Sequence, residues 1–271
     1  MPTSPEFAAA FHALHRGPEP LRLVNAWDPG SALLMQSLGA PAVATSSAAV
    51  AWARGYGDGD HLPIETLVPL VAAITRKLKV PLTVDFEGGY SADPAVVGAN
   101  VAALIDAGAA GINIEDGSAE PELLCRKTEA VRTAAARAGV PLFINARCDV
   151  YLRGLVPPEQ RVAELLARGR RYVQAGADGL FAAGAREPGE IAAICAGMDG
   201  TPVNILAMPG VPAAAELARL GVRRVSAGSG IAESVYARIA ALAGDFLRDG
   251  DGQPLGREAL PYAELNGLMS R

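Results

Sequence analysis

The sequence has few of the residues that build disulfide frameworks, zinc sites or nucleic-acid interfaces. Its three cysteines, Cys125, Cys148 and Cys195, are far apart and form no CxxC pair, so neither a disulfide framework nor a zinc ribbon is expected. Lys and Arg total 24 against 29 Asp and Glu, a net charge of -5, and no stretch collects a basic patch. We therefore expect a protein of the reducing cytoplasm that has no nucleic-acid partner.

Long hydrophobic runs are also missing. No window reaches the roughly 18 apolar residues that a membrane span requires, and Met1–Arg16 lacks the apolar run of a signal peptide. We therefore expect a soluble protein with no membrane partner. Hydrophobic residues are nevertheless plentiful, at 50% of 271, which is enough to bury a sizeable core. This length suits a single (β/α)₈ barrel of about 250 residues.

Short apolar runs alternate with helical segments along the chain. Eight runs rich in Val, Ile and Leu have the length of strands: Leu21–Asn25, Pro41–Ala44, Leu82–Phe86, Gly111–Glu115, Leu142–Arg147, Gly179–Ala182, Val203–Leu206 and Arg223–Ala227. Segments rich in Ala and Leu between them predict helices, among them Ile64–Leu78, Asp93–Ala107, Pro121–Arg137, Pro158–Ala175 and Pro212–Leu220. Eight alternating units predict parallel strands that close into a (β/α)₈ TIM barrel, with an open doubly wound sheet as the alternative.

No linker divides the chain, so residues 1–271 are expected to form a single barrel domain. An N-terminal helix precedes the first strand and carries His12 and His15, which we expect at the surface. Residues Gly244–Gly256 predict a turn that leads to a short C-terminal helix. The tail 244–271 is therefore a candidate for packing on a neighbouring subunit.

Charged side chains share one phase at the ends of three successive strand runs. Asp85 lies near the end of the third run and Glu87 directly follows it, Glu115 ends the fourth, and Arg147 ends the fifth with Asp149 two residues later. Because the carboxyl ends of barrel strands meet at one mouth, these groups are expected to converge. Crowded carboxylates cost several kcal/mol unless a cation compensates them. Because the metal-binding side chains that face this mouth offer only oxygen ligands, Mg²⁺ (or Mn²⁺) is the expected cofactor.

Six motifs occur in order along nearly the whole chain: Asn25–Ala32, Ala44–Ala48, Gly57–Gly59, Asp85–Tyr90, Ile114–Asp116 and Asn145–Asp149. Together they resemble the motifs of the isocitrate lyase/phosphoenolpyruvate mutase superfamily. The resemblance implies a metal-dependent (β/α)₈ barrel that acts on small 2-oxo and 2-hydroxy carboxylates. It also implies a homo-oligomer, a tetramer or dimer, with exchanged C-terminal helices.

The resemblance assigns roles to residues of these motifs. Asp85 would bind the metal directly, while Asp58, Glu87 and Glu115 would hold its water ligands; Glu87 stands where the superfamily usually has Asp. Arg147 would pair with a substrate carboxylate or with a developing enolate oxygen, and with Glu115 it is a candidate catalytic residue. The expected substrate-binding residues are Arg147, Ser46, Ser47, Ala48, Trp27 and Asn204.

The sequence departs from the superfamily pattern after the fourth strand. Lyases there carry a catalytic Cys in a Lys-(Lys/Arg)-Cys-Gly-His loop and mutases carry a longer gating loop, but here only Gly117–Glu120 separates Asp116 from the next helix. Cys125 lies nearby without that motif and is expected to be an ordinary helical residue. Ala183 lies in the region where mutases have a histidine.

The loop after the fourth strand would act as a lid, and a short lid leaves the reaction intermediate exposed to water. This exposure would disrupt the transfer of a reactive phosphoryl group but would still allow an enolate to be protonated. The sequence therefore favours a carbon–carbon lyase or decarboxylase for a small 2-oxo or 2-hydroxy (di)carboxylate, acting through an enolate intermediate. Two alternatives stay open, a carbon–phosphorus enzyme of the phosphonopyruvate hydrolase or phosphoenolpyruvate mutase type and a carboxylate-binding barrel without turnover. The proton donor is open among Tyr90, Tyr151 and a metal-bound water.

Overall fold

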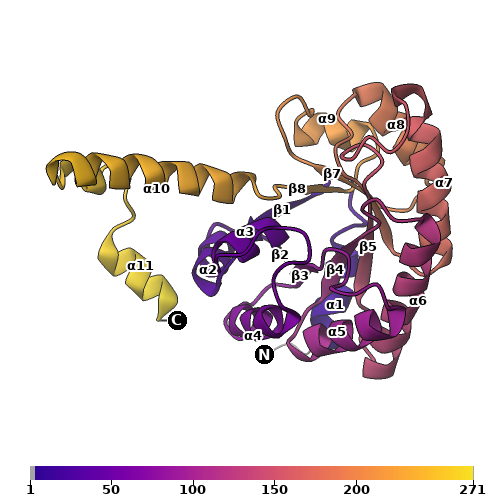
Figure 1. Cartoon of the computed structure of the whole chain (residues 1–271), viewed down its shortest axis with the longest axis horizontal. Helices are drawn as coiled ribbons and strands as arrows, with labels where there is room; N and C mark the ends of the chain where they lie inside the picture. The colour runs from indigo at the N-terminus through magenta and orange to yellow at the C-terminus, as the bar shows by residue number, and fades with distance from the viewer. Residues whose placement is uncertain (1–3, 271) are drawn as a thin grey trace.

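Eight parallel strands close into one barrel in the computed structural model, which describes residues 4–270 (Figure 1). The strands are β1 (Leu21–Ala26), β2 (Val43–Thr45), β3 (Leu82–Asp85), β4 (Gly111–Glu115), β5 (Phe143–Cys148), β6 (Gly179–Ala182), β7 (Val203–Leu206) and β8 (Arg224–Ser226). Each strand pairs with the next in sequence, and β8 pairs with β1 through Leu21 and Arg224. This closure confirms the predicted (β/α)₈ barrel and rejects the open sheet.

Helices precede, separate and follow the strands, and those between strands cover the outside of the barrel. They are α1 (Ser4–Ala13), α2 (Pro29–Ser37), α3 (Ser47–Trp52), α4 (Ile64–Thr75), α5 (Pro94–Asp106), α6 (Pro121–Ala138), α7 (Arg161–Gln174), α8 (Pro188–Gly197), α9 (Ala214–Arg219), α10 (Gly230–Asp249) and α11 (Tyr262–Met269). Local sequence explains their limits, since α5 begins with Pro94 after the Asp93 cap and α6 ends at Gly139 with φ 67°. No helix within residues 4–270 combines the length and apolarity needed to cross a membrane.

The first helix covers the end of the barrel where the strands begin. Phe11 of α1 lies edge-on to Phe143, the first residue of β5, with ring centroids 5.5 Å apart. A Cβ at Gly111, the first residue of β4, would lie 2.8 Å from the Phe11 ring, so only glycine fits there. His15 stacks on Phe143 at 4.0 Å and is 3% exposed, so its expected surface position is wrong.

The barrel interior is more polar than usual. Strand alternation sends Ile112 and Ile144 outward toward the helices, while Asn113 and Asn145 face inward. The register places Asp85 beside Asn113 and Asn113 beside Asn145, so the three inward side chains form one row across β3, β4 and β5. The row lies directly beneath the mouth of the barrel.

The C-terminal extension leaves the barrel as one long helix. The turn expected to begin at Gly244 is wrong, because α10 continues through it to Asp249 and ends only at Gly250 with φ 71°. In Figure 1, α10 projects away from the barrel, whereas α11 turns back toward it and contacts α2. A short 3₁₀ turn, Gln253–Gly256, lies between α10 and α11.

Burial of His15 predicts an acid-sensitive fold. Burial first, and then the nearby Arg224 charge, lower the pKa of His15 from 6.5 to about 3. The unfolded chain therefore binds a proton that the folded chain excludes, so this contribution to stability is complete above pH 6.5 and decreases as the pH falls below it. Between pH 7 and 5 we expect a loss of about 2 kcal/mol in the free energy of unfolding.

Chemical denaturation at pH 7 and 5 measures this loss. His15→Phe, which keeps an aromatic ring against Phe143, should remove most of the pH dependence. His12→Gln leaves His15 in place and should behave like the wild type. An unchanged pH dependence in His15→Phe would show that this site does not cause it.

Candidate active site

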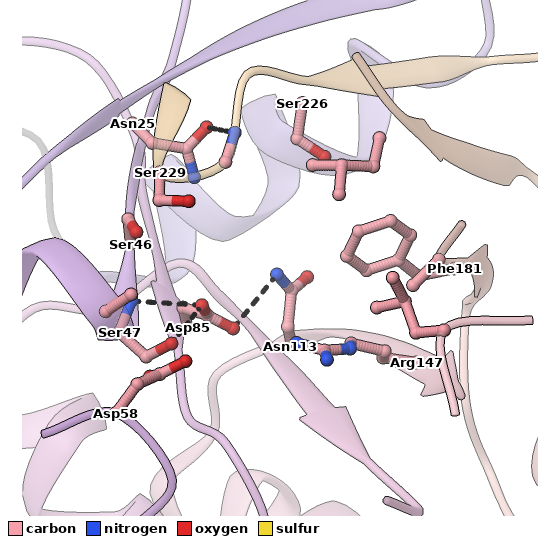
Figure 2. Close-up of a pocket in the computed structure, with 15 residues that line it drawn as sticks. Asn25, Ser46, Ser47, Asp58, Asp85, Asn113, Arg147, Phe181, Ser226 and Ser229 are labelled. Carbon is pink, nitrogen blue, oxygen red and sulfur yellow. Dashed lines mark hydrogen bonds between the residues drawn. The ribbon is translucent and has the colours of Figure 1, made fainter. Parts of the chain in front are cut away.

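A cavity of about 190 Å³ opens at the carboxyl ends of the strands (Figure 2), where barrels of this kind carry their functional residues. Its lining residues come from the ends of the strands and the loops that follow them: Asn25, Ser46, Ser47, Ala48, Asp58, Asp85, Asn113, Arg147, Leu152, Phe181, Ala183, Leu206, Ser226, Gly228 and Ser229. Its size suits a small molecule.

Asp85, the last residue of β3, has its carboxylate fixed from two sides. Its Oδ2 accepts hydrogen bonds from the backbone N of Ser47 at 3.0 Å and from the Ser47 hydroxyl at 2.8 Å. Its Oδ1 lies 3.4 Å from Nδ2 of Asn113 on β4. Its backbone N donates to the Thr45 hydroxyl at 2.8 Å. The carboxylate is therefore held in one orientation at the cavity wall, as Figure 2 shows.

Glu87 lies outside the cavity and stabilises the loop that carries Asp58. Its carboxylate accepts hydrogen bonds from the backbone N of Asp60 and, at 3.0 Å, from the Tyr90 hydroxyl. Asp60, Glu87 and Tyr90 all have positive φ, 59°, 48° and 58°, which is uncommon for residues other than glycine. Such strain persists only where surrounding contacts enforce it. Here those contacts keep the 57–61 loop against the end of β3.

The backbone of Glu87 explains why alternation along the strand predicted a different position. The strand ends at Asp85, so the period of two no longer applies two residues later. Its positive φ turns the side chain toward Asp60, where only 4% of the residue is exposed. Burial raises the pKa of Glu87 above its usual range.

Arg147, on β5, is the cation of the cavity wall, and two carboxylates orient it. Its Nε donates to Asp149 at 2.7 Å, and its Nη1 lies 2.7 Å from Glu115. Burial opposes the charge of Arg147, but Glu115 and then Asp149 outweigh burial and raise its pKa. Burial also raises the pKa of Glu115 to about 8, although Arg147 acts in the opposite direction. Because a guanidinium has five N–H donors, these contacts leave donors for a ligand.

The structure places the predicted site residues in two groups. Six of them line the cavity: Ser46, Ser47, Ala48, Asp58, Asp85 and Arg147. Four lie outside its lining: Trp27, Glu87, Glu115 and Asn204. Glu115 contacts Arg147 directly, whereas Asn204 is buried and accepts a hydrogen bond from the Ser226 hydroxyl at 2.9 Å. The backbone N of Trp27 bonds to the Ser31 hydroxyl at 3.1 Å.

One wall of the cavity is apolar, so sequence reasoning based on charged residues did not identify it. Phe181 of β6, Leu206 of β7 and Leu152 of the loop after β5 form an apolar surface. In Figure 2, Phe181 lies across the cavity from Asp58 and Ser47. Phe181 and Leu206 lie near the carboxyl ends of their strands, so attention to the apolar strand ends could have identified them. Ser226 and Ser229 add hydroxyl groups near β8.

The donors of the cavity suit a hard divalent cation. Asp58 and Asp85 supply carboxylate oxygens, and the nearby serines supply hydroxyls, which are ligands that Mg²⁺ prefers over softer metals. Within residues 4–270, no three His, Cys, Asp or Glu side chains form a ready metal cage. Mg²⁺ is commonly held by one or two carboxylates and keeps several waters. The residues therefore fit such an ion.

The loop after β4 is short and tightly held. Asp116 accepts hydrogen bonds from the Tyr172 hydroxyl at 2.7 Å, from Arg168 at 3.1 Å and from the Asp149 backbone at 2.8 Å. These bonds join the loop to β5 and α7. Cys125 lies in α6, outside the cavity lining, and burial raises the pKa of its thiol. It is therefore a poor nucleophile.

Comparisons with known proteins show which sequences and structures this chain resembles. An uncharacterized protein of Mycobacterium tuberculosis (strain H37Rv) is 38% identical over 96% of both chains. The 2-methylisocitrate lyase of Escherichia coli is 30% identical over 64% of this chain and 60% of its own. A crystal structure from Burkholderia cenocepacia J2315, provisionally assigned as a phosphonomutase, is 40% identical, with a TM-score of 0.84 over 88% of this chain and 99% of that one.

A family model described as phosphoenolpyruvate phosphomutase matches residues 11–247, which include all eight strands. A solved 2,3-dimethylmalate lyase, a member of the phosphoenolpyruvate mutase/isocitrate lyase superfamily, shares the fold with a TM-score of 0.85 at 20% identity over 99% of this chain and 95% of its own. The chain therefore belongs to the phosphoenolpyruvate phosphomutase family, within the isocitrate lyase/phosphoenolpyruvate mutase superfamily.

Proposed function

We propose that this protein is a Mg²⁺-dependent carbon–carbon lyase or decarboxylase that acts on a small 2-oxo or 2-hydroxy (di)carboxylate through an enolate. One observation carries the proposal: a fixed carboxylate, Asp85, and an oriented guanidinium, Arg147, line the same small cavity. Breaking a bond beside a carbonyl leaves negative charge on an oxygen, and the Arg147 guanidinium together with a cation held by Asp85 would suit that charge. The 2-methylisocitrate lyase among its relatives supports a lyase.

Asp85 would hold the cation directly, and Asp58 and Glu115 would hold its water ligands. The bound cation would polarise the substrate oxygen on which negative charge develops. Glu87 would support this site through the loop of Asp58, because its own carboxylate is buried against Asp60 and Tyr90. The same arrangement suits Mn²⁺, which has similar ligand preferences.

Arg147 would bind a substrate carboxylate or the enolate oxygen, and Glu115 would keep its guanidinium oriented. The backbone N–H groups of Ser46 and Ser47 are already used, by Ala26 and by Asp85. The Ala48 amide in the first turn of α3 is then the candidate donor to the second carboxylate end of the substrate.

The surroundings of the two candidate tyrosines favour water as the proton donor. Neither Tyr90 nor Tyr151 is among the residues that line the cavity. The Tyr90 hydroxyl donates to Glu87, and burial, followed by the Glu87 charge, raises its pKa. A phenol held in this way is a poor source of protons. An enolate formed in the open cavity would therefore take its proton from water.

Carbon–phosphorus chemistry is the second candidate, because the 40% identical structure is provisionally assigned as a phosphonomutase. A phosphonate group carries more negative charge than a carboxylate and favours additional cations. Arg147 is the one cationic side chain among the lining residues within 4–270, and the opposite wall is apolar. The charge of the cavity therefore favours the carbon–carbon reaction.

Turnover assays test the proposal. The Mg²⁺-loaded protein is incubated with oxaloacetate, methylisocitrate, malate analogues or phosphonopyruvate, and the release of pyruvate and phosphate is followed. We expect Mg²⁺-dependent pyruvate from a carbon–carbon substrate and no phosphate from phosphonopyruvate. Asp85→Asn should weaken Mn²⁺ binding by at least about 100-fold and abolish turnover, since a ligand contributes more than the residues behind it.

Matched variants separate this loss from general damage. Asp106→Asn makes the same change on the exposed face of α5, and it should retain activity, as should Cys125→Ser. Phosphate release from phosphonopyruvate would favour the carbon–phosphorus alternative. Binding of Mn²⁺ and oxalate without consumption of any substrate would instead indicate a carboxylate-binding barrel.

The exposed C-terminal extension supports the proposal of a homo-oligomer, a tetramer or dimer. Leu247 of α10 and Tyr262 of α11 are each 84% exposed, and Ile239 and Phe246 of α10 are about half exposed. Apolar side chains concentrated on one extension typically mark a protein interface. We propose that residues 244–271, together with the preceding turns of α10, pack on a neighbouring subunit.

Substitution of an exposed leucine tests this interface. In an isolated monomer, Leu247→Glu would be neutral, because the side chain already faces solvent. At a buried interface it should lower the molar mass measured by light scattering at micromolar concentration. Val96→Glu, a similar change on α5, is the control and should leave the mass unchanged. A wild-type monomer, or an unchanged mass for Leu247→Glu, would reject this contact.

A further inference from the structure

A buried cation lies inside the barrel beneath the cavity. Arg224, the first residue of β8, is 1% exposed and lies over the Phe11 ring, with its guanidinium carbon 5.7 Å from the ring centroid. Its Nε and Nη1 have no hydrogen-bond partner within residues 4–270. No carboxylate forms an ion pair with it in the same part of the chain. Burying such a charge is costly, so stability does not explain it.

The hydrogen bond that Arg224 does make crosses the barrel. Its Nη2 donates to Oδ1 of Asn113 at 3.0 Å. Asn113 lies on β4, four strands away in a ring of eight, so the side chain reaches toward the opposite wall. Burial lowers the pKa of Arg224 to about 9, although the charge of Asp85 acts in the opposite direction. A long buried side chain thus contacts one particular amide.

That contact determines which way the Asn113 amide faces. Its Oδ1 accepts from Arg224 and also from Nδ2 of Asn145, at 2.9 Å. Two donors on the oxygen leave the Asn113 nitrogen free to face Asp85, as Figure 2 shows. The bond from Arg224 is charge-assisted and therefore the stronger of the two. Without this bond, the Asn113 amide loses the stronger of the two interactions that fix its orientation.

We propose that Arg224 is a positioning residue for the cation site, because it orients Asn113, which in turn holds Oδ1 of Asp85. Ser47 binds the other carboxylate oxygen of Asp85. The two contacts together set the rotation of the carboxylate. Arg224 thereby acts on the cavity without lining it. This inference rests on the proposed Mg²⁺-dependent function.

Mn²⁺ binding, measured by calorimetry, and thermal stability test the proposal together. Arg224→Met removes the charge and the hydrogen bond but keeps a long side chain. We expect an equal or higher melting temperature, because the buried charge is gone. We also expect at least about 10-fold weaker Mn²⁺ binding, as for other residues that orient metal ligands. Excess Mn²⁺ should restore turnover. A purely structural role predicts the opposite change in stability.

Further variants show whether the effect passes through Asn113. Asn113→Ala alone should weaken Mn²⁺ binding, and adding Arg224→Met to it should cause no further loss. Arg224→Lys keeps the positive charge but loses the planar guanidinium, so it should also bind Mn²⁺ at least about 10-fold more weakly. If Arg224→Met does not fold, Arg224→Lys serves as the test variant. Thr83→Val, a neighbouring interior change at an unbonded hydroxyl, is the control and should bind normally.

The outcomes separate this inference from the proposed function. Wild-type Mn²⁺ affinity or tighter binding in Arg224→Met, or in Arg224→Lys where that variant carries the test, would overturn the positioning role. Independent effects of Arg224→Met and Asn113→Ala would overturn the path through Asn113. A wild-type protein that binds no Mn²⁺ would instead refute the proposed function on which this inference rests.

Discussion

The hydrogen bonds that hold the Asp85 carboxylate are the interaction on which the site depends. Asp85 ends β3, between Ser47 at the start of α3 and the Asn113 side chain of β4, and each neighbour binds one of its oxygens. The pairing of β3 with β2 and β4 brings these three groups together, and its register places Asp85 beside Asn113. A carboxylate fixed in this way can bind a cation without a further loss of side-chain entropy.

The sequence predicted most of the barrel and part of the site, for identifiable reasons. Apolar runs found all eight strands, and alternation placed Asp85 and Arg147 at one mouth because both lie within regular strands. The same rule failed for Glu87, whose backbone leaves the strand geometry with a positive φ. Phe181 was missed because an apolar strand end resembles ordinary core. Burial of His15 depends on contacts across the barrel, which local sequence does not encode.

Several buried or strained groups in and near the candidate site lower the stability of the folded barrel. Arg224 is buried with two of its guanidinium nitrogens unbonded within the described residues, and burial raises the pKa of Glu115. Glu87 also lies in the left-handed region of backbone space. The apolar layer between strands and helices, with Phe11 closing the lower end, offsets these costs. Such a distribution is expected where polar groups must be preorganised for a ligand.

A crystal structure of the protein with Mn²⁺ and oxalate tests the central claim most directly, because the anomalous signal of manganese locates the ion. We expect one strong peak in the cavity, at about 2.1 Å from a carboxylate oxygen of Asp85. Oxalate should lie between the ion and Arg147. A peak elsewhere, or none at saturating Mn²⁺, would contradict the account.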